Sequence, residues 1–286
     1  MILEYENPQV PDEVNLSQSH PLVDFLWMLI AVAGATAAVI LLLALLTDFF
    51  VSNVPFELEQ RLVTSFDLLE EGLQEEQEAD ATDREIQTYL QSLSDLLIKQ
   101  APLPEGMVVT VHYRNDELVN AFATLAGNVI IHKGLLSKLQ NENALSMVLA
   151  HEIEHVRARH PIRAMGRGII LSLALLNITG FSDSSVVETI VSSMGFLSTL
   201  SFSRNHEMEA DEAALKLLKH HYGHVEGASQ LFEVLGTEGQ SAEFIDFLST
   251  HPLNKDRIDA VNLVIASDFT TNYILTPLPE FLGEEF

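Results

Sequence analysis

The chain has 286 residues, a length that allows about two domains of roughly 150 residues each. Hydrophobic residues make up 47% and charged residues 20%, which excludes a disordered chain and a polytopic membrane protein. With 41 acidic and 15 basic residues the formal net charge is −26, so we expect no nucleic-acid partner. Cysteine is absent, so thiolate catalysis and disulfides are excluded and any metal must be bound by His, Asp or Glu.

An acidic tail, residues 1–24, precedes an uncharged apolar run at 25–46. As a helix rising 1.5 Å per residue, this run would be about 33 Å long, enough to cross a hydrocarbon core of about 30 Å. A signal peptide would need a basic N-terminal region and a shorter run, and a core helix this apolar is hard to bury in a small chain. We therefore predict a transmembrane helix, with the lipid bilayer as a partner. Arg61, the nearest base, lies on its C-terminal side and favours a cytoplasmic over a periplasmic location for the larger domain.

Residues 47–104 are predicted to be an acidic helical segment. Between residues 57 and 85, apolar residues recur at helical spacing among many acids, which indicates an amphipathic helix with a solvated acidic face. A second helix is expected at 86–98 and should end before Pro102 and Pro104.

The composition then changes from helical to β-rich. Residues 107–112, 118–124 and 129–131 favour extended structure and are separated by turn residues, so we expect about three strands in a small antiparallel sheet. From Gly134 the pattern is helical almost to the end of the chain. The predicted fold class is therefore mainly α with a small antiparallel β-sheet (α+β), behind an N-terminal transmembrane helix.

An H-E-x-x-H motif starts at His151 and ends at His155. Residues i and i+4 share one face of a helix, so both imidazoles can point at one metal ion. Glu152 is placed beside them to take a proton from water. A helix is expected over residues 143–159, because apolar residues recur there at helical spacing and Pro161 disfavours continuation at residue 160.

A third metal ligand is expected further along the chain, because catalytic zinc normally has three protein ligands and an open fourth position. Glu207 and Asp211 are four residues apart in a helical stretch, so Glu207 can bind the metal while Asp211 accepts the N–H of a ligand imidazole. His206 is a rival ligand, and Glu209 is a weaker candidate because it points to a different face. The predicted metal ligands are therefore His151, His155 and Glu207.

Several other segments accompany these residues in a recurring order. They are Asn120-Ala121-Phe122, Gly127-Asn128, Gly134-Leu135-Leu136, Ser249-Thr250-His251-Pro252 and Arg257-Ile258. Together with the metal motif they resemble the membrane-associated zinc metallopeptidases of the HtpX and CAAX prenyl protease type. The resemblance covers about residues 108–260, roughly half of the chain. It implies a gluzincin-like zinc metallopeptidase domain at 105–266, followed by a C-terminal tail at 267–286.

The resemblance also implies roles for residues outside the metal motif. Asn120, Ala121 and Phe122 would form the strand at the edge of the cleft and hold the backbone of an extended substrate. His251 would lie near the metal, where it either stabilises the oxyanion or covers the zinc. Both roles for His251 stay open at this point.

Two uncharged runs, 168–181 and 189–203, separate the metal helix from Glu207. Relatives such as HtpX carry a membrane hairpin in this place. The runs are about 15 residues each, short for a membrane span. They are interpreted either as core helices over the active-site helix or as a hairpin that dips into the bilayer.

The predicted function is that of a membrane-anchored, zinc-dependent endopeptidase with one zinc ion per chain. It would hydrolyse protein or peptide substrates, in membrane or envelope protein quality control. The alternative is a protease-like chaperone or adaptor module with little hydrolytic activity. The sequence determines neither the substrate nor the oligomeric state.

Overall fold

The computed structural model describes residues 21–51, 54–65, 80–166, 202–230, 232–233, 245–268, 270 and 273–282. The chain divides into two compact units, Met1–Leu46 and Thr47–Phe286. The uncharged runs at 168–181 and 189–203, apart from residues 202 and 203, lie outside the described residues, as does the acidic stretch at 66–79.

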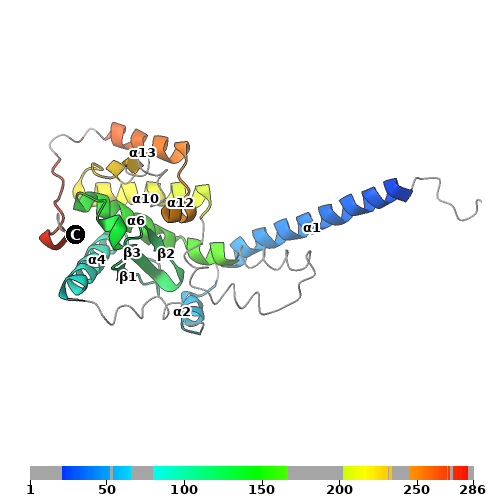
Figure 1. Ribbon diagram of the computed structural model, residues 1–286, viewed down its shortest axis with the longest axis horizontal. Coiled ribbons are helices and arrows are strands. Elements are labelled where there is room, and N and C mark those ends of the chain that lie inside the picture. Colours follow the sequence, from blue (N-terminus) through cyan, green and yellow to red (C-terminus); the bar gives the residue numbers. More distant parts are fainter. Residues whose placement is uncertain are drawn as a thin grey trace, which may run out of the picture. The chain divides into compact units, whose positions relative to one another are not determined.

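The described part of the N-terminal unit belongs to the long helix α1 (Pro21–Val51), shown in blue in Figure 1. Its stretch Pro21–Leu43 has 23 residues and a mean hydropathy of 2.5, and its most apolar part is not buried by the rest of the chain. Among the described residues it is the one helix that is long and apolar enough to cross a membrane. The structure thus gives the predicted apolar run at 25–46 the length and composition of a membrane anchor.

The described residues of the larger unit form one sheet of three strands, in the order β1-β3-β2. The strands are β1 (Thr110–Arg114), β2 (Ala121–Ala123) and β3 (Asn128–His132). The predicted antiparallel arrangement is correct for β2 and β3 and wrong for β1, which pairs with β3 in parallel. The physical reason is the strand order. Strand β2 runs opposite to β1 without pairing with it, and the chain then turns back and places β3 between them. Strand β3 therefore runs in the same direction as β1.

The turn between β2 and β3 is a 3₁₀ element, η2 (Leu125–Gly127), with two residues in the left-handed region. Ala126 has φ 58° and Gly127 has φ 77°. A Cβ atom on Gly127 would lie 1.9 Å from the carbonyl oxygen of Val108, so this position admits only glycine. The short helix α2 (Phe56–Ser65) packs against this turn, and Glu59 accepts the Ala126 N–H at 3.1 Å.

Helix α4 (Ala81–Gln100) begins at a capping box formed by Asp80 and Asp83. It therefore includes residues 81–85, which the sequence pattern assigned to the preceding acidic helix. The helix buries a stripe that includes Ile86, Leu90 and Leu97 and ends just before Pro102, as predicted. It packs along β1.

The two helices that carry the metal motif are α6 (Glu142–Arg157) and α10 (Arg204–Tyr222). Each begins at a side-chain cap, Asn141 for α6 and Ser203 for α10, and α10 ends at Gly223 in the left-handed conformation. Helix α6 contacts the sheet as well as α10 (Figure 1), which makes it the central element of the core. The remaining elements are α5 (Lys133–Leu136), α12 (Ile245–Thr250), α13 (Lys255–Ser267) and η4 (Glu280–Leu282).

Candidate metal centre and active site

The two histidines of the motif lie on the buried face of α6. Every residue from Asn143 to Val156 is buried, so this helix is enclosed along most of its length. Because His151 and His155 are one turn apart, their side chains meet, and the two Nε2 atoms are 3.0 Å apart. The helical spacing thus brings two imidazole donors to one point, as predicted.

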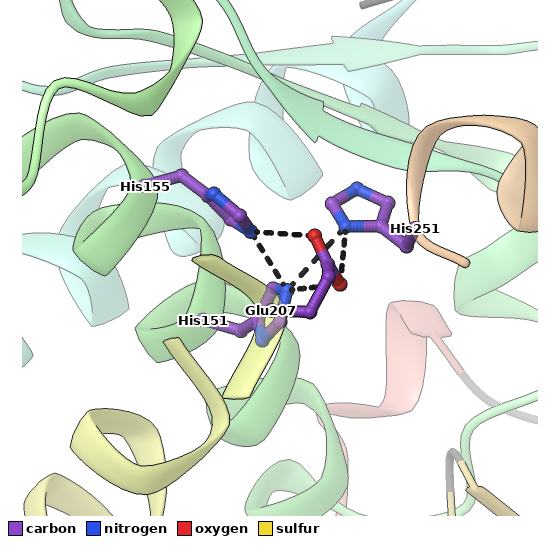
Figure 2. A group of neighbouring side chains, drawn as sticks. All are labelled: His151, His155, Glu207 and His251. Atoms are coloured by element: carbon purple, nitrogen blue, oxygen red, sulfur yellow. Dashed lines mark hydrogen bonds and ion pairs between the residues drawn. The ribbon is translucent and has the colours of Figure 1, made fainter. Parts of the chain in front are cut away.

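Two further donors converge on this point from other elements (Figure 2). Glu207, in the first turn of α10, places Oε1 3.4 Å from His155 Nε2 and Oε2 3.5 Å from His151 Nε2. His251, which directly follows α12, places Nδ1 3.4 Å from His151 Nε2 and 3.3 Å from Glu207 Oε2. All four side chains are buried, and one ligand atom of each lies within 4.8 Å of the others.

These distances fit a tetrahedral metal site. Four donors placed about 2.1 Å from a common centre would be about 3.4 Å from one another, as in zinc sites with nitrogen and oxygen ligands. The atoms of the cluster formed by His151, His155, Glu207 and His251 are separated by 3.0 to 3.5 Å where they face one another. The residues therefore fit a bound metal ion, and the donor set of imidazole and carboxylate suits zinc.

Asp211 fixes the orientation of His151. Its Oδ1 atom lies 3.0 Å from His151 Nδ1, so it accepts the N–H of this ring and leaves Nε2 free to bind a metal. Arg257 on α13 donates to both oxygens of Asp211, at 2.7 Å and 2.9 Å, and places Nη1 2.6 Å from Glu207 Oε2. One buried guanidinium thus holds the carboxylates of Glu207 and Asp211 in place.

The electrostatic environment sets the charge of each donor. Burial lowers the pKa of His155 to about 3, so this ring is neutral. Burial also opposes protonation of His151, but hydrogen bonds to Asp211 and Glu207 outweigh it and raise its pKa to about 10. For Glu207 burial favours the neutral acid, yet the facing histidines lower its pKa well below the usual value. A metal ion would therefore meet an ionised carboxylate and would displace a proton from His151.

Glu152 and His251 both contact the strand β2. Glu152 Oε2 accepts the backbone N–H of Ala123 at 2.7 Å, and burial raises the pKa of this carboxyl group. His251 Nε2 lies 3.1 Å from the carbonyl oxygen of Ala121. A carbonyl oxygen can only accept, so Nε2 donates in this contact, while Nδ1 faces His151 and the Glu207 carboxylate.

The comparison with known proteins agrees with this geometry. Residues 81–264 match the model of Peptidase family M48. The chain belongs to this family. Its relatives include the mitochondrial metalloendopeptidase OMA1 of Arabidopsis thaliana, 34% identical over 54% of this chain and 31% of the relative. OMA1 of Schizosaccharomyces pombe is 34% identical over 52% of this chain and 44% of the relative. The beta-barrel assembly-enhancing protease of Yersinia pestis is 29% identical over 61% of this chain and 38% of the relative.

The M48 membership confirms the resemblance inferred from the motifs. The chain spans between 31% and 44% of the length of these relatives, so the similarity is confined to one part of each.

Within the M48 domain, the structure separates the candidate ligands that the sequence could only rank. Glu207 joins the cluster. His206 instead stacks on His160, with ring centroids 3.9 Å apart, and Glu209 is exposed, with Oε2 3.6 Å from His160 Nε2. His160 contacts the metal cluster through His155, and the spacing of the motif did not predict this contact. His160 is fully buried, and its Nδ1 atom lies 2.8 Å from Nδ1 of His155.

The predicted substrate strand lies at the metal cluster, but its three residues differ in what they present. Asn120 and Thr124 bond to β3, through His132 N–H to Asn120 O at 3.1 Å and Thr124 N–H to Asn128 O at 2.7 Å. The backbone groups between them, the Ala121 carbonyl and the Ala123 amide, therefore face away from β3 and toward the cluster. The Phe122 side chain is buried, and its ring lies 6.0 Å from that of His132.

Proposed function

We propose that this chain is a membrane-anchored, zinc-dependent endopeptidase of the M48 family. The observation that carries the proposal is the convergence of His151, His155 and Glu207 on one point, with Glu152 beside them. The donors are those of a catalytic zinc site with two histidines and a glutamate. The protein would bind one zinc ion and cleave protein substrates.

The residues divide the chemistry of peptide hydrolysis among them. Zinc, when bound by His151, His155 and Glu207, polarises the scissile carbonyl and lowers the pKa of water to about 7. Glu152 takes the proton of the attacking water and delivers it to the leaving amine. Asp211 holds His151 in the tautomer that binds through Nε2, since it accepts the Nδ1 proton.

Substrate binding would use the edge of β2 opposite β3, which pairs with no other described strand. An extended peptide that adds to this edge would bond to the Ala121 carbonyl and the Ala123 amide, which already face the cluster. Both groups are occupied in this structure, by His251 and Glu152 respectively. A substrate strand would therefore have to replace these two contacts. Recognition through main-chain atoms tolerates many side chains, which supports a broad specificity; Asn120, Ala121 and Phe122 are the proposed substrate-binding residues.

For His251 the geometry supports the role of a covering ligand over that of an oxyanion donor. Its Nδ1 atom faces His151 and Glu207, while Nε2 is directed at the carbonyl of Ala121. With a metal bound by the other three residues, His251 would supply a fourth donor through Nδ1 and take the place of a water ligand. We propose that it holds the site at rest and withdraws when substrate binds.

Membrane attachment would come from α1, whose apolar stretch fits a single span. The position of Arg61, on the C-terminal side of α1, supports a cytoplasmic protease domain. Relatives named as a mitochondrial metalloendopeptidase and as a beta-barrel assembly-enhancing protease support a task in membrane or envelope protein quality control.

The test is zinc stoichiometry combined with digestion of casein by the purified full-length chain. We expect one zinc ion per chain, hydrolysis of casein, loss of hydrolysis on removal of zinc by a chelator, and its return when zinc is added back. A chain that binds zinc but cleaves neither casein nor membrane-protein substrates would favour the chaperone or adaptor alternative.

A further inference from the structure

We propose that His160 is a positioning residue for the metal site. It accepts a hydrogen bond from Nδ1–H of His155 and so holds that ring in the tautomer that binds zinc. This inference rests on the proposed zinc site. His160 would fix the tautomer of His155, the second histidine of the motif, as Asp211 does for His151, the first.

The tautomers follow from the contacts. His155 Nε2 faces His151 and Glu207, so it must be unprotonated to bind a metal, and the proton of the neutral ring is then on Nδ1. That Nδ1 atom lies 2.8 Å from Nδ1 of His160. A contact this short between two nitrogens is a hydrogen bond with one donor, so His160 accepts and carries its own proton on Nε2. The Nε2 atom of His160 lies 3.6 Å from Oε2 of Glu209.

The backbone is bent to bring His160 under His155. Helix α6 ends at Arg157, and Arg159 adopts φ 60°, which is unusual for a residue other than glycine. This bend allows the chain to start a new helical segment at residue 160, with His160 turned back toward the motif. The side chain of Arg159 is held in place by Glu59 of α2, with Nε 2.9 Å from Oε1, and by the carbonyl of Val54. A strained residue with two side-chain contacts indicates a position that the fold maintains.

The surroundings fix the ring planes. His160 is fully buried and stacks on His206 with an interplanar angle of 9°. His155 stacks on Phe202, with centroids 4.0 Å apart and an angle of 21°. Each ring of the pair thus has an aromatic neighbour, and the His155–His160 hydrogen bond joins the two stacks.

A pair of substitutions separates this role from simple packing. His160→Asn keeps an acceptor near the position of Nδ1 but loses much of the stacking ring. His160→Phe keeps the ring and loses the acceptor. Zinc affinity is measured by competition with a chromophoric chelator on the full-length chain, and the unfolding midpoint of the zinc-free protein is recorded beside it.

We expect His160→Phe to bind zinc about 10- to 100-fold more weakly, as is typical when the partner of a ligand histidine is lost. His160→Asn should bind zinc close to the wild-type affinity, even if it melts earlier. The opposite order, with Phe close to wild type and Asn weak, would assign His160 to packing and overturn the proposal. If His160→Phe does not fold, His160→Gln replaces it, because its amide reaches the position of Nε2 and should also weaken zinc binding. Wild-type protein that binds no zinc would instead refute the proposed function itself.

Discussion

The carboxylate of Glu152 accepts a hydrogen bond of 2.7 Å from the backbone amide of Ala123. This contact joins the proposed general base on α6 to the edge strand that would bind the substrate. It places the carboxylate between the metal ligands and the peptide that is to be cleaved. The position of the base is therefore set by the sheet as well as by the metal helix.

Glu152→Gln should keep zinc and lose nearly all turnover. The amide oxygen of Gln can still accept the Ala123 N–H, so the geometry is preserved, but an amide cannot take a proton. Positioned acid–base catalysis is typically worth about 10²- to 10⁴-fold. Steady-state cleavage and zinc content of the same preparation check this. Glu154→Gln is the matched control, since Glu154 lies on the same helix and pairs with Arg157 instead. Cleavage by Glu152→Gln at the wild-type rate would refute the assigned mechanism.

Removal of the metal should destabilise the wild-type protein but not His155→Ala. A ligand that binds only the folded state stabilises it by about 2.7 kcal/mol at a concentration 100 times its Kd. His155→Ala removes one donor and should lose both bound zinc and turnover. Denaturant unfolding with and without a chelator measures the difference. An equal response of both proteins to the chelator would contradict the assignment of His155 as a ligand.

Arg257→Met should destabilise the fold and weaken the site. The Arg257 guanidinium is buried and pairs with Asp211 and Glu207, so its loss leaves two buried carboxylates without their cation. Breaking a buried ion pair by removal of one partner typically costs about 3–5 kcal/mol. Zinc supplies part of the lost positive charge, so the zinc-free protein should suffer more.

The control for Arg257→Met is Lys255→Met on the same helix. Lys255 is exposed and lies 3.7 Å from Asp259, so its removal should change stability by less than about 0.5 kcal/mol. Equal unfolding free energies for the two variants would show that Arg257 does not support the carboxylates.

The anchor prediction is tested by deletion of residues 1–50. Full-length protein should stay in the membrane fraction through a carbonate wash because α1 can span the hydrocarbon core. The truncated protein should be released at least in part. If it stays fully bound, a second membrane contact exists, and the segment 168–203, with its two uncharged runs, becomes its candidate.

The metal site was the part of this protein most accessible from the sequence. His151 and His155, like Glu207 and Asp211, are related by i and i+4 within one helix, so the helix period alone places each pair on one face. Contacts between residues far apart in the sequence follow no local periodicity, and they were not predicted. Arg159 and Glu59 are 100 positions apart, and Arg257 and Asp211 are 46 apart, so they meet only through tertiary packing.

The sheet shows the same limit. The strands themselves were recognisable from β-forming residues, and the β2–β3 pairing follows from the short turn at Gly127. The parallel pairing of Val111 with Val129 depends on where β1 docks, and β1 is placed by its packing against α4. A local pattern could not distinguish that arrangement from a meander.

His251→Ala gives the most discriminating result, because the two roles of this histidine predict opposite signs. If His251 covers the metal, its removal opens the fourth position and turnover rises; an open state populated at about 10% would allow a rise of about tenfold. If it is an oxyanion donor, turnover falls by about 10²- to 10³-fold. The Nδ1 atom faces His151 and Glu207 at the proposed metal position, so we expect the rise, with somewhat weaker zinc binding as the fourth donor is lost.

The placement of His251 makes this test interpretable. The backbone N–H of His251 donates to the Phe247 carbonyl at 2.8 Å, and Pro252 restricts the His251 backbone, so the position from which the ring projects is fixed. Turnover and zinc affinity are measured on the same preparation with a peptide substrate. His251→Gln, which can still donate toward the Ala121 carbonyl but is a poor zinc ligand, should behave like the Ala variant if covering is the role. Unchanged turnover together with unchanged zinc affinity in both variants would reject both roles and leave His251 as a packing residue.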